Sequence, residues 1–236
     1  MIKIDHLTKT YKGGKIGAKD ICLEIEDGDI YGFIGPNGAG KTTTIKCVTG
    51  LLTFESGEIT INGLSVKKNP IECKAQIAYV PDNPEIYENL TGIQFLNFVS
   101  NVYSVSEEDR NRRIQKYAEI FGIQNDLGSV ISSFSHGMKQ KLVLISALVH
   151  KPRVLILDEP FVGLDPKASF DLKEIMKELC AEGGSVFYST HVLEVAEKLC
   201  NKVAIIRSGE IIRSGFTKDV TGDESLENLF LELVEQ

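Results

Sequence analysis

Apolar and polar residues alternate with a period of two along the first part of the chain. Residues 2–4 and 21–25 each carry isoleucine or leucine at every second position, and Gly13-Gly14 lies between these two runs. This period is typical of half-buried strands, so the pattern predicts antiparallel β-structure. Residues 57–63 alternate again and end in Asn62-Gly63, a turn signal for a β-hairpin. We therefore expect an N-terminal β subdomain.

Residues from about 91 to 151 have a helical period instead. One predicted helical face collects apolar residues before Gly122, namely Ile114, Tyr117, Ala118 and Phe121. Ser106 and Asp109 have the spacing of a capping box at the start of this helix. The pattern predicts a helical insertion within an α/β protein.

Short apolar runs at residues 30–34, 154–157 and 185–190 have the length of buried strands. Pro166 predicts the start of a helix, which we expect to carry four side chains inward: Phe170, Ile175, Met176 and Leu179. Residues 203–213 predict a hairpin around Ser208-Gly209. A final amphipathic helix follows, with Leu226, Leu229, Phe230 and Leu233 on one face.

The composition is that of a folded globular protein of one large domain. The chain has 236 residues, 42% of them hydrophobic and 25% charged. Its 26 Lys and Arg against 33 Asp and Glu give a net charge of 26 − 33 = −7, and no run of five like charges occurs. The chain thus shows neither the excess of positive charge nor the basic run that is typical of nucleic-acid-binding proteins, so we expect no nucleic-acid partner.

The apolar runs are shorter than the roughly 20 residues of a membrane-spanning helix, and residues 1–20 lack the apolar core of a signal peptide. We therefore expect a soluble, cytosolic chain. Its five cysteines, Cys22, Cys47, Cys73, Cys180 and Cys200, show no C-x-x-C spacing. Cysteines scattered in this way support neither a disulfide framework nor a zinc site, and we expect them to be buried reduced thiols.

The segment GPNGAGKT, Gly35–Thr42, matches the phosphate-loop pattern G-x-x-x-x-G-K-[ST] between a predicted strand and a predicted helix. Gly38 and Gly40 allow the backbone to turn its amide groups toward a phosphate. Lys41 would place its charge between the outer phosphates of a triphosphate, and the Thr42 hydroxyl would bind Mg²⁺. A flexible glycine-rich turn that binds nothing is disfavoured by the complete pattern in this context.

Asp158 and Glu159 directly follow the buried run at residues 154–157, at the end of a strand where open α/β sheets bind ligands. Asp158 suits Mg²⁺ coordination through water, and Glu159 suits a general base that takes a proton from the attacking water. His191 follows another predicted strand and is expected at the same edge, where its imidazole could donate to a phosphate oxygen. Two solvated loop carboxylates are the alternative, which the phosphate loop disfavours.

Ser135 is a candidate N-cap of a helix over residues 134–150, and with Gly137 it forms a second place suited to an anion. A capped amphipathic helix with no ligand is the alternative. Tyr11 could stack on a purine base or could simply pack against its neighbours. The residues alone leave both alternatives open.

The ordered set GPNGAGKTT, FSHGMKQ, LILDEP, GLD and STH resembles the ATP-binding cassette (ABC) ATPases, the nucleotide-binding subunits of ABC transporters, over essentially the entire chain. The resemblance implies an α/β fold with a P-loop NTPase (RecA-like) core, an N-terminal antiparallel β subdomain and an inserted helical subdomain. It implies one domain over residues 1–236. Residues 1–84 would be the β subdomain and first part of the core, 85–151 the helical subdomain, and 152–236 the second part of the core with the C-terminal helix.

The resemblance also implies roles for individual residues. The Walker A segment would bind ATP through Gly35, Pro36, Asn37, Gly38, Ala39, Gly40, Lys41, Thr42 and Thr43. Residues 154–159 resemble Walker B with catalytic Glu159, residues 163–165 the D-loop, and His191 the switch histidine. Ser135 and Gly137 lie in the signature motif, which in this family contacts ATP held by the opposite subunit of a head-to-tail dimer. Tyr11 resembles the adenine-stacking aromatic residue.

Two positions depart from the family pattern. His136 replaces the usual glycine of the signature motif, although Ser135 and Gly137 keep the hydroxyl and the flexible amide. Asp82 replaces the usual glutamine of the loop that joins the core to the helical subdomain, and Pro81 and Pro84 bracket this loop. Asp82 would bring a carboxylate near Mg²⁺, so the expected metal set is Thr42, Asp82 and Asp158.

The resemblance implies an ATP-hydrolysing subunit that uses ATP and Mg²⁺, works as a dimer with a second such subunit, and docks on integral membrane permease subunits. It would lie at the inner, cytoplasmic face of the cell membrane through that permease. A cassette ATPase acting on DNA or ribosomes is the alternative, although no coiled-coil insertion or tandem cassette is visible. A P-loop GTPase or kinase is rejected, since Ala204 replaces the guanine-binding carboxylate of the N-K-x-D pattern.

Overall fold

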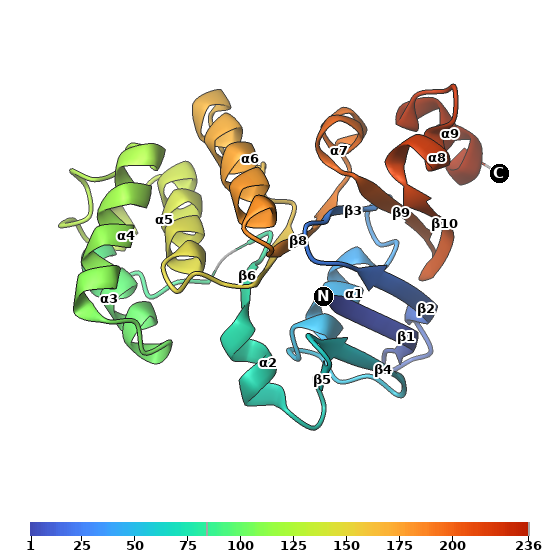
Figure 1. The fold of residues 1–236 in the computed structure, drawn as a ribbon, viewed down its shortest axis with the longest axis horizontal. Helices are drawn as coiled ribbons and strands as arrows, with labels where there is room; N and C mark the ends of the chain where they lie inside the picture. The colour runs from blue at the N-terminus through green and yellow to red at the C-terminus, as the bar shows by residue number, and fades with distance from the viewer. Residues whose placement is uncertain (84, 236) are drawn as a thin grey trace.

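The computed structural model describes residues 1–83 and 85–235, arranged as two sheets with helices around them (Figure 1). The strands are β1 Ile2–Thr10, β2 Ile16–Ile25, β3 Ile30–Ile34, β4 Ser56–Ile61, β5 Leu64–Ser65, β6 Ile77–Val80, β7 Val154–Asp158, β8 Ser185–Thr190, β9 Lys202–Arg207 and β10 Glu210–Phe216. The α-helices are α1 Lys41–Val48, α2 Pro70–Gln76, α3 Gly92–Val102, α4 Glu107–Phe121, α5 His136–Leu148, α6 Pro166–Ala181, α7 Leu193–Leu199, α8 Thr217–Thr221 and α9 Leu226–Glu235, with a 3₁₀ turn at Ile131–Ser133.

The predicted α/β fold is confirmed. One sheet has four strands in the order β2-β1-β4-β5, all pairs antiparallel. The other has six strands in the order β10-β9-β3-β8-β7-β6, in which only the β9–β10 hairpin is antiparallel. The proposed boundaries at residues 84 and 151 stay predictions, and Pro84 lies outside the described residues.

The central strands β3, β7 and β8 of the six-stranded sheet are buried on both faces, as continuous apolar strands require, whereas the edge strand β10 is largely exposed. Alternate residues of each central strand enter different cores: in β3, Ile34 joins the core beneath the helices, whereas Phe33 packs toward α1 and the four-stranded sheet. Tyr188 and Phe187 divide in the same way in β8. The fold therefore has three layers, with the six-stranded sheet in the middle.

Helices α3, α4 and α5 form the predicted helical insertion, on the left of Figure 1. The Ser106 hydroxyl accepts from the Asp109 amide as predicted, but the Asp109 carboxylate pairs with Arg113 and Arg112, which leaves only half of the expected capping box. A box with both bonds is instead present at Thr91 and Gln94.

Two predictions of burial are wrong. Phe170 is 60% exposed on α6, and the inward position belongs to Leu172, which is fully buried. Phe170 was predicted to be buried because it is hydrophobic, but the period of the helix places it on the surface. Cys22 is exposed, whereas the other four cysteines are buried as expected.

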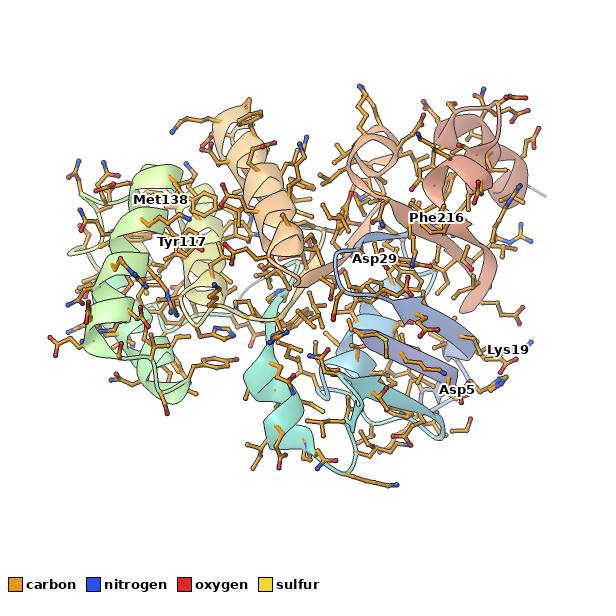
Figure 2. All side chains as sticks on the ribbon, viewed as in Figure 1. Asp5, Lys19, Asp29, Tyr117, Met138 and Phe216 are labelled. Atoms are coloured by element: carbon orange, nitrogen blue, oxygen red, sulfur yellow. The ribbon has the colours of Figure 1, made fainter. Side chains whose placement is uncertain are left out.

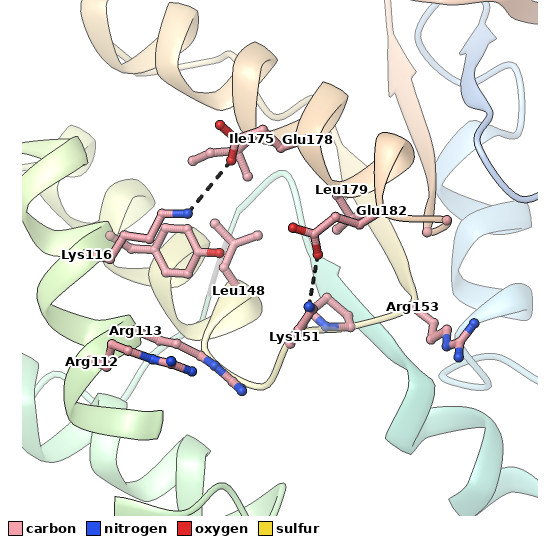
Figure 3. A pocket seen from close by; sticks show the side chains of 14 residues that line it. Arg112, Arg113, Lys116, Leu148, Lys151, Arg153, Ile175, Glu178, Leu179 and Glu182 are labelled. Carbon is pink, nitrogen blue, oxygen red and sulfur yellow. Dashed lines mark ion pairs between the residues drawn. The ribbon is translucent and has the colours of Figure 1, made fainter. Parts of the chain in front are cut away.

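A cleft of about 570 Å³ lies between α4 and α6 (Figure 3). It lies beside Arg153 and Gly184, which precede β7 and β8, so it faces the amino ends of these strands. Two ion pairs span it, Lys116 with Glu178 at 3.8 Å and Lys151 with Glu182 at 2.9 Å. The cleft is therefore separate from the carboxyl edge of the sheet, where the motifs lie.

The two side chains on α6 give a matched test of the fold. Leu172→Ala should lower the free energy of unfolding by about 2–5 kcal/mol, because it leaves a cavity in the core. Phe170→Ala should change it by less than about 0.5 kcal/mol, because the ring is largely in solvent. Denaturant unfolding of both variants measures the difference, and equal losses would contradict this placement of the helix.

Candidate active site

The carboxyl ends of β3, β8, β7 and β6 bring the predicted site residues to one edge of the sheet. The parallel register pairs Ile34 with Thr190, Ser189 with Asp158, and Leu157 with Val80. The phosphate loop, His191, Glu159 and Asp82 follow these strand ends directly. Strands that are distant in sequence thus deliver their loops side by side.

The glycines of the phosphate loop are required by neighbouring backbone as well as by loop conformation. A Cβ at Gly35 would lie 2.4 Å from the carbonyl oxygen of Ile206, and one at Gly40 would lie 2.3 Å from that of Gly17. Gly40 also has a φ of 112°. Only Gly38 faces open space, with a φ of 80°. Two of the three glycines are therefore fixed by packing.

Lys41 is buried inside this loop at the first position of α1. Its Nζ donates to the carbonyl oxygens of Gly35 at 2.6 Å and Pro36 at 3.3 Å. The same Nζ lies 3.7 Å from Oε1 of Glu159. The ammonium thus sits where the loop and the end of β7 meet.

Asp158 is almost completely buried at the end of β7. Its Oδ1 accepts a hydrogen bond from the Ser189 hydroxyl on β8, while its Oδ2 has no hydrogen-bond partner among the described residues. A buried carboxylate oxygen is costly without a partner. This oxygen is therefore suited to a cation or its bound water.

Glu159 adopts a left-handed backbone with a φ of 50°, a conformation that costs a non-glycine residue about 1–3 kcal/mol. Its amide donates to the carbonyl oxygen of Ser189 at 3.2 Å and to the Ser189 hydroxyl at 3.3 Å. Its Oε2 lies 3.0 Å from Nδ1 of His191, whose side chain is 54% exposed against 12% for Glu159. The carboxylate therefore lies between an ammonium and an imidazole.

Ser189 is the functional candidate that sequence reasoning missed. It touches both Asp158 and Glu159, so one hydroxyl positions two adjacent acids. The signal was the STH run, read only for its histidine. The contact follows from the β7–β8 register, which the sequence does not state.

Tyr11 lies beside the phosphate loop. Its hydroxyl is 3.0 Å from Oγ1 of Thr43, and its ring covers Gly17, where a Cβ would come within 2.7 Å of Cε2. The side chain is 38% exposed. This arrangement leaves part of the ring accessible, so adenine stacking stays a prediction.

The signature segment contacts the D-loop. Ser135 caps α5 by accepting from the Met138 amide at 3.2 Å. The His136 ring packs on Gly163, where a Cβ would lie 2.6 Å from Cδ2, and a Cβ on Gly137 would lie 2.9 Å from the Gly163 oxygen. Within the described ranges, no hydrogen bond or ion pair of Ser135 or Gly137 reaches the phosphate loop.

An ion pair also links the helix of the signature segment to the D-loop. Lys141 of α5 lies 2.6 Å from Oδ2 of Asp165, the N-cap of α6, and this hydrogen-bonded pair lowers the pKa of Asp165. Asp165 also accepts from the Ala168 amide at 2.8 Å. The start of α5 and the D-loop are therefore held together.

Asp82 and Thr42 are exposed, and neither is hydrogen-bonded or ion-paired to Asp158 in the part of the chain that the structure describes. Asp82 lies just beyond β6, next to β7. Its charge raises the pKa of the Tyr79 hydroxyl, after burial and Asp158 as the larger causes. The three expected metal ligands thus share an edge without direct contact.

Ser189 and Ser185 lie on the same strand and allow a matched test. Ser189→Ala removes the donor to the buried Asp158 carboxylate, so it should lower the free energy of unfolding by about 1–3 kcal/mol. Ser185→Ala removes a hydroxyl that has no partner among residues 1–83 and 85–235, and should be neutral or stabilising. Denaturant unfolding measures both. A larger loss for Ser185→Ala would exclude the positioning contact.

The described helices include none that is both long enough and apolar enough to span a bilayer. Residues 18–162 match the family model described as ABC transporter. The ABC-type transporter ATP-binding protein EcsA of Bacillus subtilis is 34% identical, over 100% of this chain and 97% of that protein.

Two solved structures extend the comparison. The structure of an ATP-binding subunit of an ABC transporter superposes with a TM-score of 0.94 at 34% identity, covering 99% of both chains. The dimeric ATP-binding cassette MJ0796, bound to ADP and Pi, shares the fold with a TM-score of 0.83 at 23% identity, over 92% of this chain and 99% of that one. The chain therefore belongs to the ABC transporter family and has the fold of its ATP-binding cassettes.

Proposed function

We propose that the protein binds and hydrolyses ATP to power transport through a separate membrane-spanning partner. The observation that carries this proposal is the place of Glu159, 3.7 Å from the phosphate-loop ammonium of Lys41 and 3.0 Å from His191. A base, a phosphate-binding cation and a hydrogen-bond donor then converge at one sheet edge. Together these three groups suit the hydrolysis of a phosphoanhydride, because they can activate water and stabilise charge on the phosphate.

The residues fit ATP with Mg²⁺. The buried cation of Lys41 and the open position at Gly38 suit the phosphates, and the first turn of α1 contains no acidic residue that would repel them. The unpartnered Oδ2 of Asp158 suits a cation, with Thr42 and Asp82 as further ligands. Bound Mg²⁺ would supply positive charge that neutralises the phosphate oxygens.

Each residue then has a distinct task. Lys41 would exchange its contacts with the Gly35 and Pro36 carbonyl oxygens for contacts with the outer phosphates. Glu159 would accept the proton of the attacking water. His191 would donate to a phosphate oxygen, and its 3.0 Å contact with Glu159 holds both side chains at the site.

We further propose a head-to-tail dimer with two ATP at its interface. Gly137 lies against Gly163 of the D-loop, and Ser135 bonds the Met138 amide of its own helix. Among the described residues neither is bonded to its own phosphate loop, which leaves both available to a second subunit. In this arrangement each signature segment would contact ATP bound by the partner. The dimeric cassette among the structures with this fold is consistent with such an assembly.

Glu159→Gln tests the catalytic part of the proposal. An amide cannot take a proton from water, so turnover should fall by about 10²–10⁴-fold while ATP binding is kept. The stalled protein should accumulate as a dimer with ATP and Mg²⁺, seen by light scattering. Glu227→Gln, on the exposed start of α9, is the control. Normal turnover of Glu159→Gln would exclude the general base.

The proposed membrane partner has a suitable surface on the helical insertion. Tyr87 and Phe98 are both exposed and meet edge to face at 5.8 Å, and Val102 is exposed at the end of α3. Exposed apolar groups of this kind mark protein contacts. We propose that this surface docks on the permease, which would place the protein at the inner face of the membrane.

Phe98→Glu should abolish co-purification of a membrane protein from detergent extracts and leave ATPase activity of the isolated protein unchanged. A charge at a buried apolar contact is costly, which gives the expected loss. Phe170→Glu makes the same change on α6 and should keep the complex. Recovery of nucleic acid or ribosomes instead of a membrane protein would favour the alternative function.

A further inference from the structure

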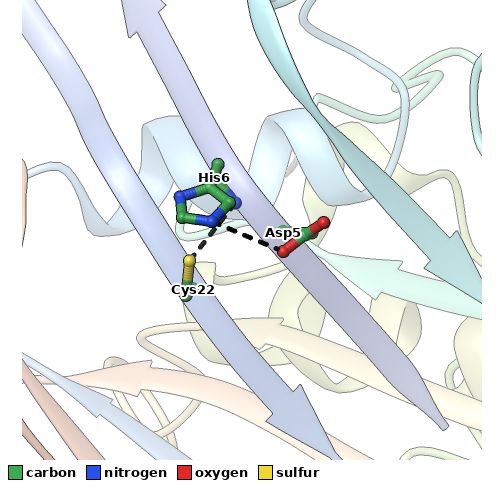
Figure 4. Close-up of side chains that lie close together, drawn as sticks. All are labelled: Asp5, His6 and Cys22. Atoms are coloured by element: carbon green, nitrogen blue, oxygen red, sulfur yellow. Dashed lines mark hydrogen bonds and ion pairs between the residues drawn. The ribbon is translucent and has the colours of Figure 1, made fainter.

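A second group of chemically active side chains lies on the exposed face of the four-stranded sheet. Asp5 and His6 are on β1 and Cys22 is on β2 (Figure 4). Figure 2 shows Asp5 at the opposite side of the molecule from Met138, which lies on the signature helix. The group is thus distinct from the signature segment and belongs to a different sheet from the strand ends that carry the hydrolysis site.

A β-bulge brings the three side chains together. Ile4 pairs with Leu23 and Leu7 with Ile21, so two residues of β1, Asp5 and His6, oppose the single residue Cys22. Successive side chains of a regular strand point to opposite faces, but the extra residue cancels this alternation. Asp5, His6 and Cys22 are accordingly all exposed, while their neighbours along each strand are buried.

The bulge is held by the backbone conformation of β1 and by close packing against β4. His6 has a left-handed backbone with a φ of 51°. On the other neighbouring strand, β4, a Cβ at Gly57 would lie 2.5 Å from the His6 oxygen and 2.6 Å from the Asp5 oxygen. Such strain persists only where the surrounding structure imposes it, so the fold fixes the backbone positions from which these side chains project.

The ligand atoms lie close to the spacing that a metal ion requires. One donor atom from each residue lies within 4.8 Å of the others, and Nε2 of His6 is 3.9 Å from Oδ1 of Asp5. The ligands of a tetrahedral zinc ion lie about 3.3 to 3.6 Å apart, given its usual bond lengths. Small rotations of these exposed side chains would close the difference.

Asp20 adds a second, independent observation. Its Oδ1 lies 2.6 Å from Nδ1 of His6, so the carboxylate holds the proton on Nδ1 and leaves the lone pair on Nε2, which faces Asp5. A histidine that binds a metal commonly makes this bond to a carboxylate with its other nitrogen. Asp20 is itself placed by a second irregularity, between the pairs Leu7–Ile21 and Lys9–Ala18.

We propose that the Asp5 carboxylate, Nε2 of His6 and the Cys22 thiolate bind a divalent ion of the zinc class. Thiolate, imidazole and carboxylate together suit zinc, whereas Mg²⁺ and Ca²⁺ prefer oxygen alone. Cys22 is the exposed cysteine, and the other four are buried. Three protein ligands leave one position for water.

Cobalt(II) titration of the reduced, nucleotide-free protein tests the site, because a thiolate ligand gives cobalt a charge-transfer band that oxygen ligands do not. One equivalent should produce the band, and Zn²⁺ should remove it by displacement. Cys22→Ser should abolish the band. Absence of the band in the wild-type protein, or its survival in Cys22→Ser, would overturn the proposal.

Affinity measurements separate the ligands from general surface charge. Asp5→Asn and His6→Asn should each weaken Zn²⁺ binding at least tenfold, and asparagine tolerates the left-handed backbone at position 6. Asp20→Asn should weaken it about 10–100-fold through the His6 ring. Glu24→Gln removes an equal charge from β2 next to Lys3 without removing a ligand, and should leave affinity unchanged. A loss for Glu24→Gln as large as that for Asp5→Asn would refute a specific site.

Discussion

The parallel pairing of β3, β8 and β7 is the constraint on which the candidate active site depends. These strands are buried on both faces, so their register is fixed by two cores at once. A shift of one residue would move every side chain to the other core and carry Glu159 and His191 away from Lys41. The sheet therefore determines how precisely the site residues are positioned, both those at the strand ends and those in the loops that follow.

Charge at this edge is only partly compensated within the protein. Lys41 pairs with Glu159 and donates to two loop carbonyl oxygens. Only one oxygen of Asp158 has a hydrogen-bond partner among the described residues, the Ser189 hydroxyl. A strained backbone at Glu159 is held in place by the same serine. The Lys41 ammonium is thus suited to an anion, and the unpartnered oxygen of Asp158 to a cation.

Much of the fold could be predicted from the sequence because the patterns are local. Periods of two and of three to four residues, Asn62-Gly63 and Pro166 gave the strands, the hairpin and the long helices. The role of Ser189 could not be predicted, because it depends on the register between two strands and joins residues that are 31 apart in the sequence. The exposure of Cys22 could have been predicted, because it lies between the buried Ile21 and Leu23 of an alternating strand. Its place beside His6 could not, because it depends on a bulge in β1 that has no clear local signal. Phe170 was misjudged by its hydrophobicity alone.

Because neighbouring backbone crowds Gly35 and Gly40, the presence of these two glycines does not by itself indicate nucleotide binding. The oxygens of Ile206 and Gly17 leave no room for a side chain at these positions, whether or not a nucleotide ever binds. A descendant of this protein that had lost catalysis would still have to keep both glycines in order to fold. Gly38, which meets nothing within 4 Å, is under no such packing requirement. The φ of 80° at Gly38 still favours glycine there, so in degenerate cassettes of this architecture Lys41 should be the informative marker of lost activity, while the glycines should persist as relics.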